Sequence, residues 1–202
     1  MSKESDFFVR RLHSLLGVIP VGLFVAQHLV VNHFATRGEE AFNNASNFMG
    51  NLPFVTFLEW FIIYIPLMFH AFYGVYIAFS AKYNVGHYGT FRNWMFTLQR
   101  FTGVFLVIFI AWHVYETRIQ KALGATVDFN MMADILSNPL MLVFYIAGIL
   151  SATFHLANGL WSFCVTWGIA QSPNSQKIVS YITMIVFLVL SVIGIQALLA
   201  FV

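Results

Sequence analysis

Five long apolar stretches, separated by short polar segments, dominate the sequence. Each is long enough for an α-helix to cross a hydrocarbon layer of about 30 Å, which takes about 20 residues. This pattern predicts an all-α membrane protein with five transmembrane helices, in which residues 1–202 form a single domain. The expected helices are His13–Phe34, Phe54–Phe79, Phe96–Thr117, Pro139–Trp167 and Ile178–Val202.

The composition excludes other classes of protein. Hydrophobic residues make up 59% of the chain and charged residues only 9%, whereas soluble proteins have about 25% charged residues. An aromatic content of 18% argues against disorder. A net charge of +2 is too small to indicate a nucleic-acid partner. With Cys164 as its single cysteine, the sequence has neither a disulfide framework nor a thiolate iron–sulfur site.

The basic residues predict how the helices are oriented in the membrane. The N-terminus and the second and fourth loops hold most of them, namely Lys3, Arg10, Arg11, Lys82, Arg92, Arg100 and Lys177. The first and third loops hold Arg37, Arg118 and Lys121. Because basic loops stay in the cytoplasm, we expect a cytoplasmic N-terminus and a C-terminus outside. The end of the bundle that carries the N-terminus is called the inner end below, and the opposite end the outer end.

Each of the first four predicted spans contains one histidine deep within the apolar stretch: His28, His70, His113 and His155. His13 and His33 lie at the two edges of the first span. Ionisable side chains are costly in a membrane and usually face the bundle interior. A single such histidine is more often an interhelical hydrogen-bonding group than a ligand. The helix rise, however, sorts the four into two layers. His28 and His113 fall in the outer half, and His70 and His155 about 24 Å below the outer surface, in the inner half.

Two imidazoles from facing helices suit the axial positions of a haem iron, although imidazole binds other metals too. Glycines strengthen the haem interpretation. Gly74 and Gly159 follow His70 and His155 by four residues, on the same helix face, and would leave room for a flat macrocycle. Gly17 and Gly103 lie near the depth of the inner pair. Close helix packing would explain single glycines equally well. The combination predicts two haems, with His28 and His113 on the outer one and His70 and His155 on the inner one.

Long runs of the sequence resemble one family. These are Phe7–Gly17 (FFVRRLHSLLG), Gln27–Asn32 (QHLVVN), His70–Tyr76 (HAFYGVY), Trp112–Val114 (WHV) and His155–Trp161 (HLANGLW). They resemble the single-chain, five-helix, two-haem cytochrome b anchor of succinate:quinone oxidoreductase, the succinate dehydrogenase of Bacillus relatives. The resemblance covers the whole chain and implies that the four histidines are axial ligands of two b haems.

The same resemblance implies partners and a place in the cell. A flavoprotein subunit with FAD would oxidise succinate, and an iron–sulfur subunit would pass the electrons to the inner haem. Both would bind the cytoplasmic face of this chain in a bacterial cell membrane. The outer haem would reduce a quinone, which is menaquinone in Bacillus-type enzymes. The chain would not itself oxidise succinate.

Two further groups of residues are candidates for binding roles. At the inner end, haem propionates or partner acids are expected to contact Arg10, Arg11, His13, Arg92 and Arg100, because arginine forms charge-assisted pairs with carboxylates. At the outer end, a quinone site is expected to involve Asn32, His33, Glu59 and Glu116. The alternative for each of these residues is an interfacial position without a specific role.

Two other functions fit part of the pattern. The b-type anchor of a formate dehydrogenase or nitrate reductase would also have paired histidines, but the matched runs argue against it. A metal or proton transporter that uses histidines would typically add midplane Asp or Glu residues, which the spans lack.

The predicted orientation can be tested at position 92, which should face the cytoplasm. In intact cells, an Arg92→Cys variant is expected to resist a membrane-impermeant thiol reagent and to react once the cells are opened. The unsubstituted chain, with Cys164 alone, is the blank. Labelling from outside would reverse both the orientation and the face assigned to the partners.

Overall fold

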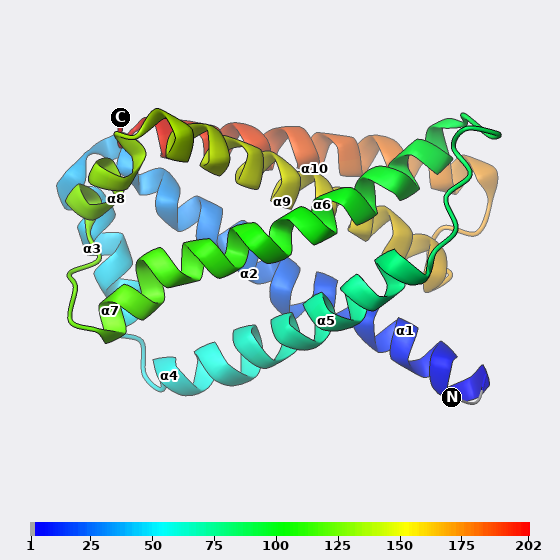
Figure 1. Cartoon of the computed structure of the whole chain (residues 1–202), viewed down its shortest axis with the longest axis horizontal. Helices are drawn as coiled ribbons and strands as arrows, with labels where there is room; N and C mark the ends of the chain where they lie inside the picture. Colours follow the sequence, from blue (N-terminus) through cyan, green and yellow to red (C-terminus); the bar gives the residue numbers. More distant parts are fainter. Residues whose placement is uncertain (1–2) are drawn as a thin grey trace.

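The computed structural model describes residues 3–202, with the backbone alone for Lys3, and this part of the chain forms five long helical segments side by side (Figure 1). The first comprises α1 (Lys3–Val18), α2 (Pro20–Asn32) and the 3-10 turn η1 (His33–Arg37). The second comprises α4 (Val55–Leu58), η2 (Glu59–Tyr64) and α5 (Ile65–Ser80). The third comprises α6 (Phe91–Val114), η3 (Tyr115–Ile119) and α7 (Gln120–Ala122). The last two are α9 (Pro139–Thr166) and α10 (Pro173–Leu199).

The prediction of an all-α protein with five membrane-spanning helices is confirmed. Within the described residues, the candidate spans are Glu4–Arg37, Val55–Ser80, Phe91–Ala122, Pro139–Thr166 and Pro173–Leu199. The termini lie at opposite ends of the bundle, as five crossings require (Figure 1).

The first helix begins well before the expected His13. Its additional turns carry charged residues, of which Arg10 and Asp6 form an i,i+4 ion pair at 2.8 Å. Such pairs stabilise an exposed helix turn without requiring an apolar sequence. Pro20 interrupts this segment after Val18, because proline cannot supply a backbone N–H to the preceding turn.

The starts of the last three long helices follow from local capping chemistry. The side chains of Thr90, Asn138 and Ser172 each accept a hydrogen bond from a backbone N–H of the first turn. Proline follows directly after Asn138 and Ser172, at a position where a helix tolerates it. These caps fix where α6, α9 and α10 enter the bundle.

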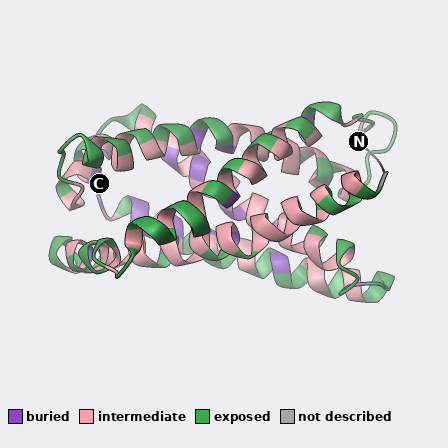
Figure 2. Ribbon diagram, turned by 90° about the horizontal axis from the view of Figure 1, so that it is seen from below, coloured by how far each residue is buried: buried purple, intermediate pink, exposed green. Residues whose placement is uncertain are grey.

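The outer faces of the helices are apolar and exposed. Buried positions are few and lie where helices face one another, while exposed positions run along the outside (Figure 2). Large apolar side chains more than half exposed include Leu23, Phe72, Phe101, Ile185 and Val192. Water would not support so much contiguous apolar surface, whereas a bilayer does.

A cluster of buried apolar residues lies toward the end that carries the C-terminus. Two short helices cover this end, α3 (Glu39–Gly50) and α8 (Phe129–Leu136). Phe42 of α3, Phe129 of α8 and the C-terminal Phe201 meet at ring-centroid distances of 4.8–6.1 Å. The same cluster contains Phe109 and Tyr145 from the long helices.

Glycines allow the closest helix crossings. A Cβ added at Gly148 of α9 would overlap the Phe109 ring of α6. One added at Gly194 of α10 would lie 2.7 Å from Ile149 of α9. Small residues at such positions let membrane helices approach closely enough for van der Waals packing to hold them together.

A Gly148→Ala substitution is therefore expected to destabilise the bundle by about 1–3 kcal/mol, the usual effect of overpacking a filled site. Thermal unfolding of the detergent-solubilised protein should show a lower midpoint. Gly86→Ala is the matched control, because a Cβ at Gly86 would have no atom within 4 Å. Equal midpoints for the two variants would contradict this account of the α6–α9 crossing.

Candidate functional site

The four intramembrane histidines meet as two pairs. The rings of His28 and His113 have centroids 5.8 Å apart, and those of His70 and His155 are 6.1 Å apart. Both pairs are close to perpendicular, at 72° and 89°. These are the pairs expected from the depths of the residues in the sequence. Each joins two different helical segments, α2 with α6 and α5 with α9.

The separation suits one metal atom between two ring nitrogens. An imidazole nitrogen binds a metal at about 2 Å, so that two such bonds and the two ring radii together span roughly 6 Å. Among the described residues, no group of three or more His, Cys, Asp or Glu side chains could hold a metal ion. The chain therefore offers two-histidine sites rather than a site made of several protein ligands.

Hydrogen bonds of the inner pair leave one ring nitrogen of each histidine for a metal. The Nδ1 of His70 lies 3.0 Å from the carbonyl oxygen of His13. The Nδ1 of His155 lies 3.1 Å from the carbonyl oxygen of Gln99. A carbonyl only accepts, so Nδ1 carries the hydrogen in both rings and Nε2 keeps its lone pair. Partners of this kind fix the tautomer of metal-binding histidines.

The outer pair has side-chain partners instead. The Nδ1 of His113 lies 3.3 Å from the hydroxyl of Tyr145. The amide of Asn32 donates to the carbonyl oxygen of His28 at 2.8 Å and lies 3.3 Å from its Nε2. Phe24 and Phe109 pack beside the two rings.

The four candidate glycines all lie around the inner pair. A Cβ at Gly17 would overlap the His70 ring, and one at Gly103 would lie 3.0 Å from the His155 ring. Gly74 and Gly159 face other side chains: a Cβ at Gly74 would be 3.2 Å from the Nε2 of His13, and one at Gly159 would be 3.4 Å from the Nε2 of Gln99.

Three buried polar atoms near the inner end have no hydrogen-bond partner among the described residues. They are the Nε atoms of Arg11 and Arg100 and the Nε2 of His13. The His13 ring also stacks on His70, with centroids 4.1 Å apart and planes 4° apart. Buried polar atoms without partners are costly. Carboxylates would accept hydrogen bonds from the two arginine N–H groups, and from His13 where its Nε2 carries a hydrogen. Arg11, His13 and Arg100 are among the residues that the sequence predicts to bind haem propionates.

The other two inner candidates are held by the protein itself. Arg10 pairs with Asp6 at the surface. The guanidinium of Arg92 donates to the hydroxyl of Ser180 and lies 3.7 Å from the ring centroid of Trp161. The side chain of Arg92, which comes from α6, therefore contacts both α9 and α10.

The four candidate quinone residues have different partners, of which Asn32 has His28, as described above. Glu59 accepts a hydrogen bond from Arg118 at 2.7 Å, and Glu116 accepts one from Tyr145 at 2.8 Å. The Nδ1 of His33 lies 3.2 Å from the carbonyl oxygen of Ile193 in α10. Both acids lie in π-helical segments, η2 and η3, and such segments occur frequently at functional sites.

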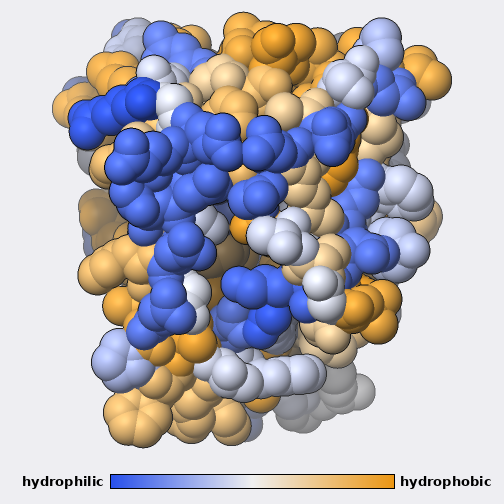
Figure 3. Space-filling model, turned by 90° about the vertical axis from the view of Figure 1, so that its left-hand side faces the viewer, coloured by the Kyte–Doolittle hydropathy of each residue, from blue (hydrophilic) through white to orange (hydrophobic). Residues whose placement is uncertain are grey.

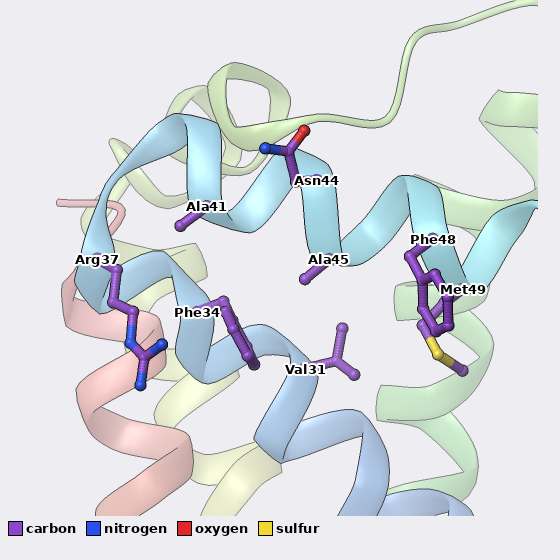
Figure 4. A pocket seen from close by; sticks show the side chains of 8 residues that line it. All are labelled: Val31, Phe34, Arg37, Ala41, Asn44, Ala45, Phe48 and Met49. Carbon is purple, nitrogen blue, oxygen red and sulfur yellow. The ribbon is translucent and has the colours of Figure 1, made fainter.

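The surface of this end separates polar from apolar regions. Hydrophilic residues spread across the middle of the end, with hydrophobic residues around its margins (Figure 3). A groove of about 430 Å³ lies between α2 and α3; its lining residues are Val31, Phe34, Arg37, Ala41, Asn44, Ala45, Phe48 and Met49 (Figure 4). The candidate quinone residues do not line this groove.

Four polar residues of the site were missing from the sequence-based candidates. Gln99 accepts from His155, and its amide donates to the His155 carbonyl oxygen at 3.0 Å. Asn158 donates to the Gln99 side chain at 2.9 Å. Tyr145 and Arg118 bind the two acids at the outer end. Gln99, Asn158 and Tyr145 lie inside predicted spans, and Arg118 directly follows one. Polar residues within a span usually face the bundle interior, so the criterion that selected the histidines could also have found these three.

Fold and site together define an integral membrane protein of five spans with two pairs of histidines. The two rings of each pair lie close together, and the pairs lie at different depths. Residues 78–194 match the family of succinate dehydrogenase/fumarate reductase transmembrane subunits. The chain is 61% identical to the succinate dehydrogenase cytochrome b558 subunit of Bacillus subtilis (strain 168), over 100% of both sequences. The chain belongs to this family, and its resemblance to a succinate dehydrogenase cytochrome b anchor is confirmed. Family membership also sets aside the formate dehydrogenase, nitrate reductase and transporter alternatives.

Proposed function

We propose that this subunit binds two b haems and carries electrons from an iron–sulfur subunit across the membrane to a quinone. The observation that carries the proposal is the pairing of four intramembrane histidines at ring-centroid distances of 5.8 and 6.1 Å. The name of the Bacillus subtilis relative, a cytochrome b558 subunit, supports haem as the group that the histidines hold. Haem supplies one-electron chemistry when bound.

The chain's own residues prepare these positions. His70 and His155 present Nε2 because their Nδ1 atoms are bonded to backbone carbonyls. Gly17 and Gly103 have no side chains, and this leaves room for the rings of His70 and His155. Arg11, His13 and Arg100 provide buried donors for carboxylates on the inner side.

The membrane potential would favour electron transfer between two haems at different depths. Electrons that move from the negative cytoplasmic side outward are driven by about 2.3 kcal/mol per charge for each 100 mV. For two electrons, the free energy released at 100 mV is about 4–5 kcal/mol. This free energy helps to reduce a quinone of low potential such as menaquinone. A single haem level would not span the bilayer.

The flavoprotein and iron–sulfur subunits would bind at the inner end. The basic residues gather there, and a positively charged face suits acidic partner surfaces. Arg10 pairs with Asp6, but its side chain is half exposed, so that a carboxylate of a partner can also reach it.

Substituting the histidines one at a time tests the haem assignment. His28→Ala or His113→Ala should remove one component of the reduced-minus-oxidised b spectrum, and His70→Ala or His155→Ala the other, because each haem would lose an axial ligand. His87→Ala is the control, since His87 lies exposed in the loop before α6. A spectrum in which both components survive any of the four substitutions would refute that ligand.

The quinone is expected at the outer end, near Asn32, His33, Glu59 and Glu116. A quinone needs hydrogen-bond donors at its carbonyls and protons as it is reduced, and groups near water can supply both. Glu59 of η2 is bonded to Arg118 of η3, and Glu116 of η3 is bonded to Tyr145 of α9. Protonatable groups and hydrogen-bond donors therefore lie side by side at this end.

Glu59→Gln, His33→Ala and Glu116→Gln test this site in the assembled complex. Quinone reduction should fall by about tenfold or more in at least one variant, since positioned acids and bases contribute about 10²–10⁴-fold. Both haem spectra and electron transfer from succinate to a dye should stay intact. Glu40→Gln is the control, because Glu40 is an exposed acid of α3 at the same end. Normal quinone reduction in all three variants would move the site elsewhere, for example beside the inner haem.

A further inference from the structure

A hydrogen-bond chain runs from the outer histidine pair to an acid. The Nδ1 of His113 lies 3.3 Å from the Tyr145 hydroxyl, and that hydroxyl donates to the Oε2 of Glu116 at 2.8 Å. The three residues come from α6, α9 and η3. Tyr145 is only 3% exposed, so that water does not compete for these bonds and the low dielectric strengthens them.

The direction of the hydrogens follows from their number. A tyrosine hydroxyl has one hydrogen, and here the Glu116 carboxylate receives it. Toward His113 the hydroxyl oxygen can then only accept, so Nδ1 of His113 must carry the hydrogen. The Nε2 of His113 is thereby left as the nitrogen with a free lone pair.

The ring and the hydroxyl of Tyr145 have separate roles, because the ring packs and the hydroxyl forms the hydrogen bonds. Phe109 lies stacked beside His113 with ring centroids 6.0 Å apart and meets the Tyr145 ring edge-on at 5.4 Å. These ring contacts would hold a phenylalanine at position 145 equally well. The hydroxyl adds the link to Glu116, which ring packing does not need.

The inner pair lacks such a link. His70 and His155 direct Nδ1 at the backbone carbonyls of His13 and Gln99, which are neutral and fixed. The Thr102 hydroxyl near His155 is also neutral. The partner of His113 is a side chain that is itself polarised by a carboxylate, which makes it a stronger acceptor.

We propose that Tyr145 is a positioning residue of the outer haem, which orients His113 and lowers the midpoint potential of that haem through its hydroxyl bond. The proposal rests on the proposed function, since it takes His113 as an axial ligand. A hydrogen bond from the far ring nitrogen makes an imidazole more basic. A more basic ligand stabilises the oxidised, more positive iron, and the potential falls.

The test is a redox titration of the assembled complex with Tyr145→Phe, followed by optical and electron paramagnetic resonance spectra. Both b components should persist, and the outer one should shift to higher potential while the inner one stays in place. The His28 and His113 variants identify which component is the outer one. Tyr115→Phe is the matched control, a half-exposed tyrosine whose ring contacts Trp112, and it should shift neither component.

Unchanged potentials in Tyr145→Phe, or an equal shift in Tyr115→Phe, would overturn the proposal. If Tyr145→Phe lost the outer haem altogether, the same redox titration of Glu116→Gln would test the proposal. That variant keeps the tyrosine and its packing but makes its partner neutral, so a smaller upward shift supports the proposal and no shift overturns it. A wild-type complex without two b components would instead refute the proposed function.

Discussion

The hydrogen bond from an imidazole Nδ1 to a backbone carbonyl of the neighbouring helix is the interaction on which the inner site depends. Within a bilayer no water can satisfy that N–H, and a buried donor without a partner is costly. His70 uses the carbonyl of His13, and His155 uses that of Gln99. In each case the receiving helix has a glycine four residues further on, Gly17 or Gly103, beside the incoming ring. A carbonyl can accept a second hydrogen bond in addition to its helical one, but only where no side chain blocks the approach.

The contact is reciprocal on both sides of the inner site. His13 lies against Gly74, one turn after His70, and Gln99 lies against Gly159, one turn after His155. Each helix thus contributes a polar residue and a glycine four residues later, and the polar residue of one helix fills the space beside the glycine of the other. The same arrangement joins α1 to α5 and α6 to α9. Two copies of one local packing solution therefore fix the relative depth of four helix segments.

Sequence alone gives this arrangement only in part. The depths of His28, His70, His113 and His155 follow from helix rise, and the structure pairs them accordingly. The spacing of four residues in His13–Gly17 and Gln99–Gly103 is also visible in the sequence. However, nothing in the sequence says that Gln99 faces His155, since rotation about a helix axis depends on packing against the neighbours.

The outer end shows the same limit more strongly. Glu59 and Glu116 are recognisable as acids near the membrane surface, but their partners Arg118 and Tyr145 come from helices that are distant in sequence. The π-helical segments η2 and η3 have no sequence signal of the kind that Thr90 or Ser172 provides for a helix start. Likewise, charge in residues 4–11 hides the early start of α1, since ion pairing rather than apolarity supports those turns.

The two ends of the bundle differ in how their charges are satisfied, and this difference bears on what each end can bind. At the outer end the acids Glu59 and Glu116 already have donors within the chain. Glu59 has the positive charge of Arg118 beside it, and Glu116 accepts from a neutral hydroxyl, so each acid keeps a hydrogen-bond partner when a neutral molecule approaches. At the inner end Arg11, His13 and Arg100 keep buried nitrogen atoms without partners among the described residues. We propose that carboxylates of a haem or of a partner subunit bind at this end, because arginine forms charge-assisted hydrogen bonds with carboxylates.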